Sequence, residues 1–161
     1  MSSIKFDTKG IDNLLGTLDN LSDVEIAAGV FQESGMHEEA ELHKAHLLVI
    51  QEKGAIGIFP ARPVIGLTTH EEGVKWGEDA VKDIKGAIDK NGNRSPLSVN
   101  KLKKSLENVA DEMADDIKAN FGSSKLAANS PSTIARKGGN NPLIESGELR
   151  DSIEGKVRRS K

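Results

Sequence analysis

Histidine and carboxylate side chains gather in one short stretch of the chain. Three of the four histidines fall there among acids: His37, His43 and His46 beside Glu38, Glu39 and Glu41. Imidazole and carboxylate groups are zinc ligands, so metal binding is one hypothesis. The spacing differs from the His-Glu-x-x-His of zinc proteases, because a second Glu, an Ala and a third Glu follow His37-Glu38. The alternative is a polar loop that happens to contain histidines, and we predict no metal site and no cofactor.

Groups that could serve as acids, bases or nucleophiles are present without a catalytic motif around them. Carboxylates fall on predicted helices, where they form solvated faces: Glu71, Glu72, Asp111, Glu112, Asp115 and Asp116. General acid–base catalysis requires convergent groups instead. Gly138-Gly139 lacks the flanking strand and helix of a phosphate loop, and no serine stands in a Gly-x-Ser-x-Gly elbow. Cysteine is absent, which excludes a thiol nucleophile. The sequence predicts that the protein is not an enzyme.

Charge is distributed unevenly along the 161 residues, although the net charge is only −3. Residues 125–161 contain eight Lys or Arg and four Asp or Glu. Residues 1–124 contain 14 Lys or Arg and 21 Asp or Glu. The basic C-terminal arm could seat on an acidic partner or on DNA, or it could simply be solvated. The acidic balance of the whole chain gives no general attraction to nucleic acid. Four Phe and one Trp are too few for a platform that stacks single strands.

The length suits one domain, which we predict over residues 1–161. The first residues contain no apolar segment, so we expect no signal peptide. The longest apolar run, residues 47–50, is far shorter than the about 20 residues that cross a bilayer. We therefore expect a soluble protein with a core of Leu, Ile, Val and Ala.

Hydrophobic periodicity predicts the elements of the first half. Ile4-Lys5-Phe6 alternates like a short strand, and apolar residues over 8–21 recur with a helical period. Residues 24–31 are typical of a strand, and residues 32–42 of a loop or hairpin tip. A short helix over 43–53 is expected to end at Gly54 and to bury Ala45, Leu48 and Val49. Two prolines, Pro60 and Pro63, should then hold residues 55–63 extended.

Two long helices are predicted in the second half. Thr69 and Glu72 fit a capping box, which indicates a helix over 70–89 with Trp76 on its apolar face. After the breaker at residues 91–93, Ser95-Pro96 should open the second helix. Its apolar residues keep the helical period throughout: Leu102, Leu106, Val109, Ala110, Met113, Ile117 and Phe121. Residues 122–142 are typical of a long loop, and residues 149–157 of a strand.

These elements together indicate an α+β fold. Short strands stand near both ends of the chain, and the long helices lie between them. We expect a small, mainly antiparallel sheet packed with two long helices, plus extended loops near 32–42 and 122–142.

Two stretches of the chain resemble a known family. The first is Gln51-Glu52-Lys53-Gly54-Ala55, leading to Phe59-Pro60-Ala61-Arg62-Pro63-Val64-Ile65. The second is Asn129-Ser130-Pro131-Ser132-Thr133-Ile134-Ala135-Arg136-Lys137-Gly138, leading to Asn141-Pro142-Leu143-Ile144-Glu145-Ser146-Gly147-Glu148-Leu149-Arg150-Asp151-Ser152-Ile153. Their order and the helices between them are similar to those of tailed-bacteriophage virion-morphogenesis proteins, also called neck or tail-completion proteins. Four residues depart from the family pattern: Lys53, Val64, Glu145 and Ser146.

The resemblance implies a structural protein of the head–tail junction that acts as a ring of copies. Its partners would be other phage structural proteins, namely the connector or adaptor and the tail terminator or tube. Its location would be the virion, after synthesis in the bacterial host cytoplasm. A head–tail adaptor or tail terminator of the same particle is the alternative, and a small DNA-binding protein is a weaker one. The mixed charges over residues 96–121 differ from a basic recognition helix.

Candidate docking residues come from the two stretches. They are Pro60, Ala61, Arg62, Pro63, Leu143, Ile144, Gly147, Leu149, Arg150, Ser152 and Ile153. We expect most of them to serve folding and a minority to contact a partner. Arg62 could donate a bidentate bond to a carboxylate, or it could be a surface arginine without a partner. Gly147 is expected in a turn. Leu143, Ile144, Leu149 and Ile153 are expected in core or sheet contacts.

Overall fold

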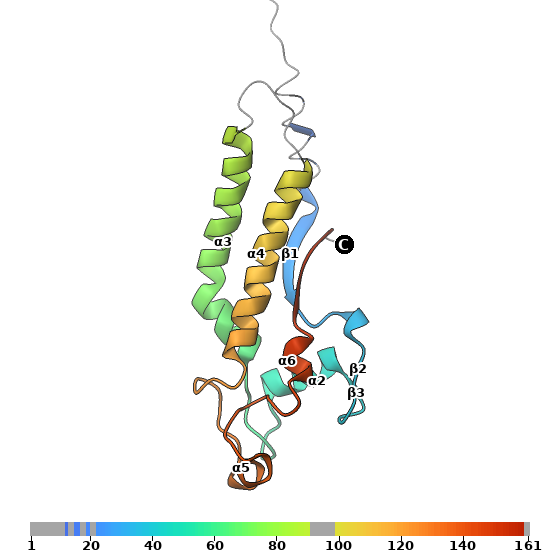
Figure 1. Ribbon diagram of the computed structural model, residues 1–161, viewed down its shortest axis with the longest axis vertical. Helices are drawn as coiled ribbons and strands as arrows, with labels where there is room; N and C mark the ends of the chain where they lie inside the picture. The colour runs from blue at the N-terminus through green and yellow to red at the C-terminus, as the bar shows by residue number, and fades with distance from the viewer. Residues whose placement is uncertain (1–11, 13–14, 17–18, 20–21, 91–98, 160–161) are drawn as a thin grey trace, which may run out of the picture.

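The computed structural model describes residues 12, 15–16, 19, 22–90 and 99–159. Among these residues the fold is α+β, with two long helices beside small antiparallel sheets (Figure 1). The elements are β1 Val24–Gly29, the 3₁₀ turn η1 Gln32–Ser34, β2 Met36–His37, β3 Leu42–His43, α2 Lys44–Lys53, α3 Val64–Lys90, α4 Val99–Asn120, α5 Pro131–Lys137, α6 Glu148–Asp151 and β4 Glu154–Arg159.

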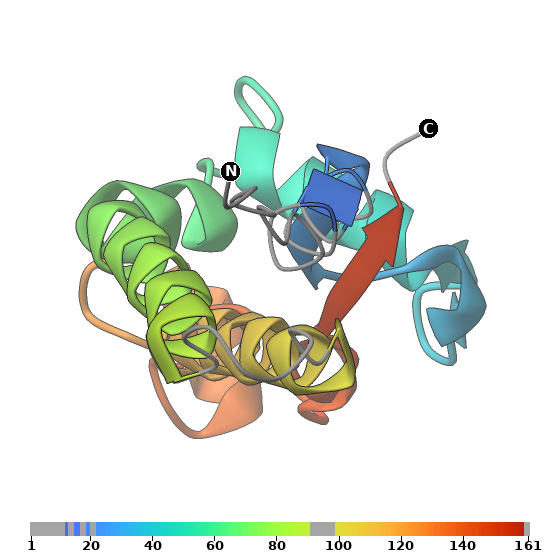
Figure 2. The same cartoon turned by 90° about the horizontal axis from the view of Figure 1, so that it is seen from above.

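Helix α4 is the centre of the molecule, with α3 on one side and the β1–β4 sheet on the other (Figure 2). Its apolar positions are buried as their spacing predicts: Leu102, Leu106, Val109, Ala110, Ala114 and Ile117, followed by Phe121. From α3, Trp76 packs into the same core and donates its indole N–H to Asp116 Oδ2 at 2.8 Å. That bond satisfies the polar atom of an otherwise buried ring.

Strands β1 and β4 pair antiparallel, so the first and last described strands meet in one sheet. Ile26 lies opposite Val157 and Ala28 opposite Gly155, and this face of the sheet covers α4. A Cβ on Gly155 would lie 2.0 Å from the backbone oxygen of Ala110, so strand and helix touch at their backbones. Glycine is therefore required at this position for the sheet to reach the core.

Three predicted elements of the first half are confirmed: the strand that begins at residue 24, the hairpin within 32–42 and the helix that ends at Gly54. The extended conformation predicted for residues 55–63 is wrong at its start, because Ala55 and Phe59 close a tight turn. Residues 24–29 form β1, and the stretch 32–42 contains a 3₁₀ turn and the β2–β3 hairpin. Helix α2 ends at Gly54, whose φ of 67° and N–H bond to Ile50 O are those of a glycine cap. Leu48 is buried as expected, but Val49 is half exposed, which contradicts its predicted burial.

The predicted start of the first long helix is wrong. Helix α3 begins at Val64, and Thr69 lies inside it. Its start is stabilised by Glu52 of α2, whose carboxylate accepts bonds from Ile65 N at 2.6 Å and Gly66 N at 3.4 Å. A carboxylate there satisfies free N–H groups and interacts favourably with the helix dipole. Because the cap comes from another helix, the local pattern at Thr69 and Glu72 could not reveal it.

Two further predictions need correction in the C-terminal part. The stretch 122–142 is not loop throughout, because α5 forms at Pro131–Lys137. The strand predicted over 149–157 begins only at Glu154, and Leu149 lies in the helical turn α6. Leu149 of α6 and Ile153, which lies just before β4, are both buried. Residues four apart share a face in a helix and in a strand alike, so their spacing could not separate the two.

Some predictions lie outside the described residues. These are the strand at residues 4–6, the breaker at 91–93 and the helix opening at residues 95–96. Within the stretch 8–21 the structure describes residues 12, 15, 16 and 19, and all four are helical.

Candidate functional site

The segment between α2 and α3 folds into a tight turn that projects from the body of the molecule. Ala55 and Phe59 form an antiparallel bridge, and Gly57 at the tip has a φ of 74°. A Cβ on Gly54 would lie 2.5 Å from Ala61 N, so only glycine lets the two legs of this loop approach. Hereafter residues 55–59 are called the 55–59 turn.

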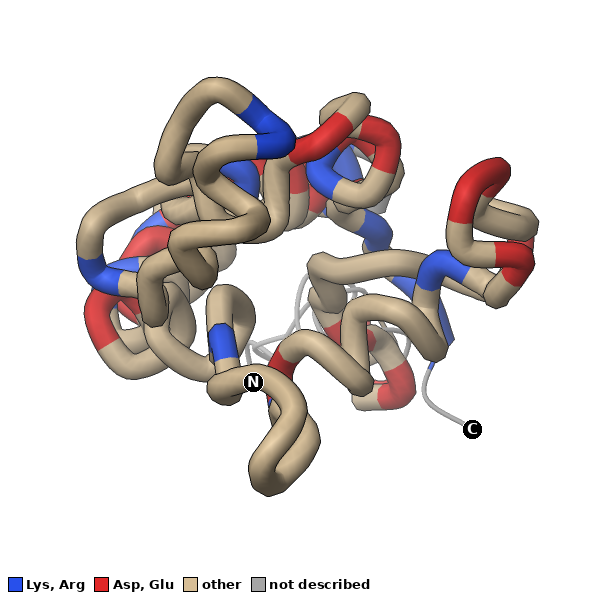
Figure 3. Tube along the Cα trace, turned by 90° about the horizontal axis from the view of Figure 1, so that it is seen from below, with Lys and Arg blue, Asp and Glu red and all other residues tan. Residues whose placement is uncertain are grey.

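The 55–59 turn holds two isoleucines in water. Ile56 is 105% exposed and Ile58 is 82% exposed. The turn contains no charged residue and appears as an uncharged loop at the rim of the molecule (Figure 3). Sequence reasoning missed these residues, because an isoleucine in an apolar run is normally a core residue.

Arg62 ties the first stretch of the resemblance to the second. Its Nε donates to Ala127 O at 2.8 Å, and its Nη2 donates to Ala128 O at 3.1 Å and to Asn129 Oδ1 at 3.3 Å. The residue is only 9% exposed, and burial lowers the pKa of its guanidinium. Both interpretations of Arg62 from the sequence are therefore wrong: its partners are carbonyl oxygens of its own chain. Its neighbours Pro60, Ala61 and Pro63 are exposed.

The second stretch begins with a capped helix. Ser130 caps α5 by accepting a bond from Thr133 N at 3.3 Å, and Pro131 occupies its first position. Gly138 ends the helix in the left-handed conformation with a φ of 72°. Just before the cap, Asn129 N donates to Asn140 Oδ1 at 2.9 Å, which closes the loop around α5.

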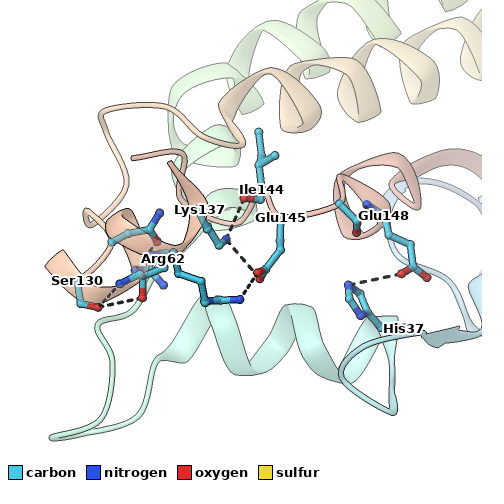
Figure 4. A network of polar contacts seen from close by, with 11 residues as sticks. His37, Arg62, Ser130, Lys137, Ile144, Glu145 and Glu148 are labelled. Atoms are coloured by element: carbon cyan, nitrogen blue, oxygen red, sulfur yellow. Dashed lines mark hydrogen bonds and ion pairs between the residues drawn. The ribbon is translucent and has the colours of Figure 1, made fainter. Parts of the chain in front are cut away.

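The chain after α5 is fixed by bonds to its backbone. Gly122 N donates to Pro142 O at 2.9 Å, and Lys137 Nζ donates to Ile144 O at 2.9 Å (Figure 4). Leu143 takes a φ of 65°, which is rare for a residue with a side chain. Leu143 and Ile144 are partly buried against the core, as predicted.

Glu145 lies between the two cations at the end of α5. Its carboxylate is 2.6 Å from Arg136 Nη1 and 3.5 Å from Lys137 Nζ. Burial alone would raise the pKa of Glu145, but the bonds and charges of Arg136 and Lys137 bring it below its ordinary value.

Helix α6 joins this region to the β2–β3 hairpin and to α2. Gly147 precedes α6 with a φ of 86°, so its predicted place in a turn is confirmed. The carboxylate of Glu148 is 2.9 Å from Lys44 Nζ and 3.6 Å from His37 Nε2. The hydrogen bond from Lys44 is the main cause of a lowered pKa at Glu148.

The remaining candidate docking residues mostly make contacts within α6. Arg150 pairs with its neighbour Asp151 at 2.8 Å, and Ser152 Oγ donates to Leu149 O at 2.7 Å. Leu149 and Ile153 are buried in the core. Leu149 and Ile153 therefore contribute to the core, Ser152 bonds within its own turn, and Arg150 makes a surface ion pair.

A groove of about 450 Å³ runs between the two stretches and is lined by both. Its apolar wall includes Leu47, Ile58, Phe59 and Leu143, and α5 and α6 supply its polar walls. Within the described part of the chain, the buried atoms Asn129 Nδ2 and Gln51 Oε1 have no hydrogen-bond partner, and both residues line this groove. An unpaired buried polar atom is costly, so it is typical of a site that is completed by another molecule or by water.

The histidines do not converge. His43 accepts a bond from Ala45 N as the cap of α2 and contacts Gln32 O at 2.8 Å, His37 lies beside Glu148, and His46 and His70 are exposed. Over the ranges that the structure describes, no group of three or more His, Cys, Asp or Glu side chains is placed to hold a metal ion.

The basic C-terminal arm is not a free arm, because residues 154–159 form β4. Most of its described cations have acidic partners within the chain: Lys125 with Glu71, Arg136 and Lys137 with Glu145, Arg150 with Asp151, Lys156 with Glu33 and Glu154, and Arg158 with Glu25. Lys156 and Arg158 also lie over the ring of Phe31, at 4.4 and 5.7 Å from its centre.

Comparison with known proteins gave no match among family models, curated proteins or solved structures. Among the described helices, none has both the length and the apolar character required to span a membrane.

Proposed function

We propose that this chain is a structural assembly protein at the head–tail junction of a tailed phage or prophage, a neck or tail-completion component that acts as a ring of copies. It would act by ordered binding, without catalysis. The supporting observation is that the two stretches of the resemblance, more than 60 residues apart, meet through Arg62 and line one groove.

The 55–59 turn adds support from physical chemistry. Exposure of Ile56 and Ile58 to water is unfavourable, and a partner that covers these side chains would lower the free energy. The turn is prepared for docking, because Gly54 and the bridge between Ala55 and Phe59 already hold its shape. Such preorganisation lowers the entropic cost of association.

Other roles for the chain are a head–tail adaptor, a tail terminator and a DNA-binding protein. A head–tail adaptor or a tail terminator differs from a neck protein in its neighbours, and both remain alternatives within the proposal. DNA binding is less favoured, because most cations of the C-terminal segment already have acidic partners. In α4, Lys103 and Lys118 also pair with acids of the same helix.

The proposal places the protein in the virion after its synthesis in the bacterial host. The partners would be the connector or adaptor on the head side and the tail terminator or tube on the tail side. Deletion of the gene in the parent phage, followed by electron microscopy of the lysate, tests this directly. Filled heads beside separate tails are expected, and normal infectious virions would refute the structural role.

Complementation of the deletion tests the turn itself. The double variant Ile56→Ser/Ile58→Ser removes the exposed apolar groups and leaves the core unchanged. We expect it to accumulate in the cell and yet leave heads and tails unjoined. Val74→Ser is the matched control, since Val74 is 76% exposed on α3 and distant in sequence from the turn. If both variants restore infectious particles, the turn is not the docking element. This conclusion would hold even if the gene deletion leaves filled heads beside separate tails.

A further inference from the structure

Helix α3 carries apolar residues on two faces. Its inner face packs beside α4, where Trp76 is buried in the core and Ala80 packs against it. On the outer face, Val74 is 76% exposed and Val81 is 49% exposed. These valines are seven residues apart, so they lie about two turns from each other on one side of the helix. Helix α3 lies at one side of the molecule, and its outer face is open to water (Figure 2).

A glycine leaves a hollow between the two valines. A Cβ on Gly77 would meet no atom within 4 Å, so the space above this residue is empty of the chain's own side chains. Glycine weakens the interior of a helix, and its use is that it lets another group approach closely. The hollow belongs to a shallow groove whose lining includes six exposed residues of the outer face: Val74, Gly77, Glu78, Val81, Lys82 and Lys85.

The charges of the outer face are separated along the helix. Glu78 comes before Val81, and Lys82 and Lys85 come after it. In the part of the chain that the structure describes, none of these three charged side chains has an ion-pair partner.

This separation makes the face complementary to itself in one orientation. When two such helices lie antiparallel with Val81 near the centre, Glu78 of each helix faces the lysines of the other. In a parallel arrangement the lysines would face lysines, and like charges across an interface are unfavourable. Two antiparallel copies of one face are related by a two-fold axis, so each copy contributes the same residues.

We propose that α3 docks against α3 of a second copy of this chain as an antiparallel pair. Val81 of each copy enters the hollow over Gly77 of the other, and the aliphatic stem of Lys85 covers Val74. The contact involves one helix from each copy, so we expect a weak pair that forms at high protein concentration. The pair goes beyond the proposed function and does not depend on it. A two-fold pair closes on itself, so a ring of copies would use another surface.

Sedimentation velocity of the purified full chain over a wide range of concentrations tests the pair. We expect a concentration-dependent dimer for the natural chain. Gly77→Gln should be monomeric, because its side chain fills the hollow that Val81 of the other copy requires. The same change should raise the unfolding temperature, since glutamine favours a helix more than glycine does and meets no neighbour within one copy. Loss of the dimer in a more stable protein is then not a consequence of misfolding.

Charge reversal tests the antiparallel orientation. Glu78→Lys and Lys82→Glu should each raise the dimer dissociation constant about tenfold, because each places like charges opposite each other. The double variant should restore the dimer, since the signs are then exchanged in both copies. Both residues are exposed and have no ion-pair partner among the described residues, so the fold of one copy should not change.

Two further variants separate this pair from contacts of the 55–59 turn. Ile56→Ser/Ile58→Ser should dimerise like the natural chain, because the turn lies outside α3. Val74→Ser should weaken the pair only slightly, because the hollow, Val81 and the charges remain, so it stays a valid control for the turn in complementation. A natural chain that is monomeric at all concentrations, or a dimer that Gly77→Gln leaves unchanged, would overturn the inference and leave the proposed function intact.

Discussion

Replacement of Arg62 by methionine should destabilise the protein far more than replacement of an exposed arginine. Arg62 makes two bonds of good length, to Ala127 O at 2.8 Å and Ala128 O at 3.1 Å, and a longer one to Asn129 Oδ1 at 3.3 Å. A hydrogen bond from a charged donor contributes about 1.5–3 kcal/mol. Methionine keeps the apolar stem but leaves the partly buried carbonyl oxygens of Ala127 and Ala128, and the buried Asn129 Oδ1, without this donor. Allowing for non-additivity, we expect a loss of about 3–4 kcal/mol in the free energy of unfolding.

Arg136→Met is the matched control for this change. Arg136 is 65% exposed in its side chain and pairs with Glu145 at the surface. Exposed ion pairs contribute only about 0–1 kcal/mol, so this variant should remain close to the natural chain. Arg62→Lys should fall between the two, because an ammonium group cannot reproduce the fork of a guanidinium.

Urea denaturation gives the free energies, and hydrogen exchange gives the location of the effect. Arg62→Met should expose the amides of residues 122–142 to faster exchange, because Arg62 is what ties residues 127–129 to the segment before α3. Hydrogen exchange of the α4 amides should become faster only by the amount that the loss of global stability causes. The reasoning would be refuted if Arg62→Met lowered the free energy of unfolding no more than Arg136→Met does. That result would mean that the hydrogen bonds of Arg62 within the chain do not stabilise the fold.

Three further changes test other contacts. Gly155→Ala should destabilise the fold by about 3 kcal/mol or more in urea denaturation, because its Cβ would lie 2.0 Å from Ala110 O; an unchanged midpoint would contradict the close approach. Glu52→Gln should cost about 1 kcal/mol in the same assay through loss of the carboxylate at the start of α3, and a neutral result would refute that cap. Glu148 has a pKa below its ordinary value of 4.5, mainly because of Lys44, so its stabilisation is complete above pH 4.5 and is lost as pH falls through the lower folded pKa. Unfolding free energies between pH 6 and 3 should therefore fall less steeply for Glu148→Gln, and an equal slope would contradict this.

The two long helices, α2 and the first strand could be predicted because their signals are local. The apolar residues of α4 recur with the helical period from Leu102 to Ile117, and burial of one stripe follows directly. The strand over 24–29 and the glycine that ends α2 are likewise set by neighbours in the chain. Periodicity and capping depend on residues close together in the chain, so they can be recognised in the sequence.

The errors arose where residues distant in the sequence decide the local structure. The start of α3 depends on Glu52, which lies one element earlier and reaches its N-terminus through space. The predicted strand over 149–157 is replaced at its beginning by α6, which buries Leu149, and Ile153 is buried between α6 and β4. Alternating polarity alone cannot separate a turn of helix followed by a strand from one longer strand.

The candidate site shows the same division. The sequence by itself predicted the two stretches and the turns at Gly54 and Gly147, because proline fixes φ and glycine accepts a positive φ wherever they stand. Only the tertiary structure decided that Arg62 is buried against carbonyl groups, that Ile56 and Ile58 face water and that Asn129 and Gln51 lack partners. Burial and hydrogen-bond partners depend on which segments meet in space, and that is fixed by the packing of the whole chain.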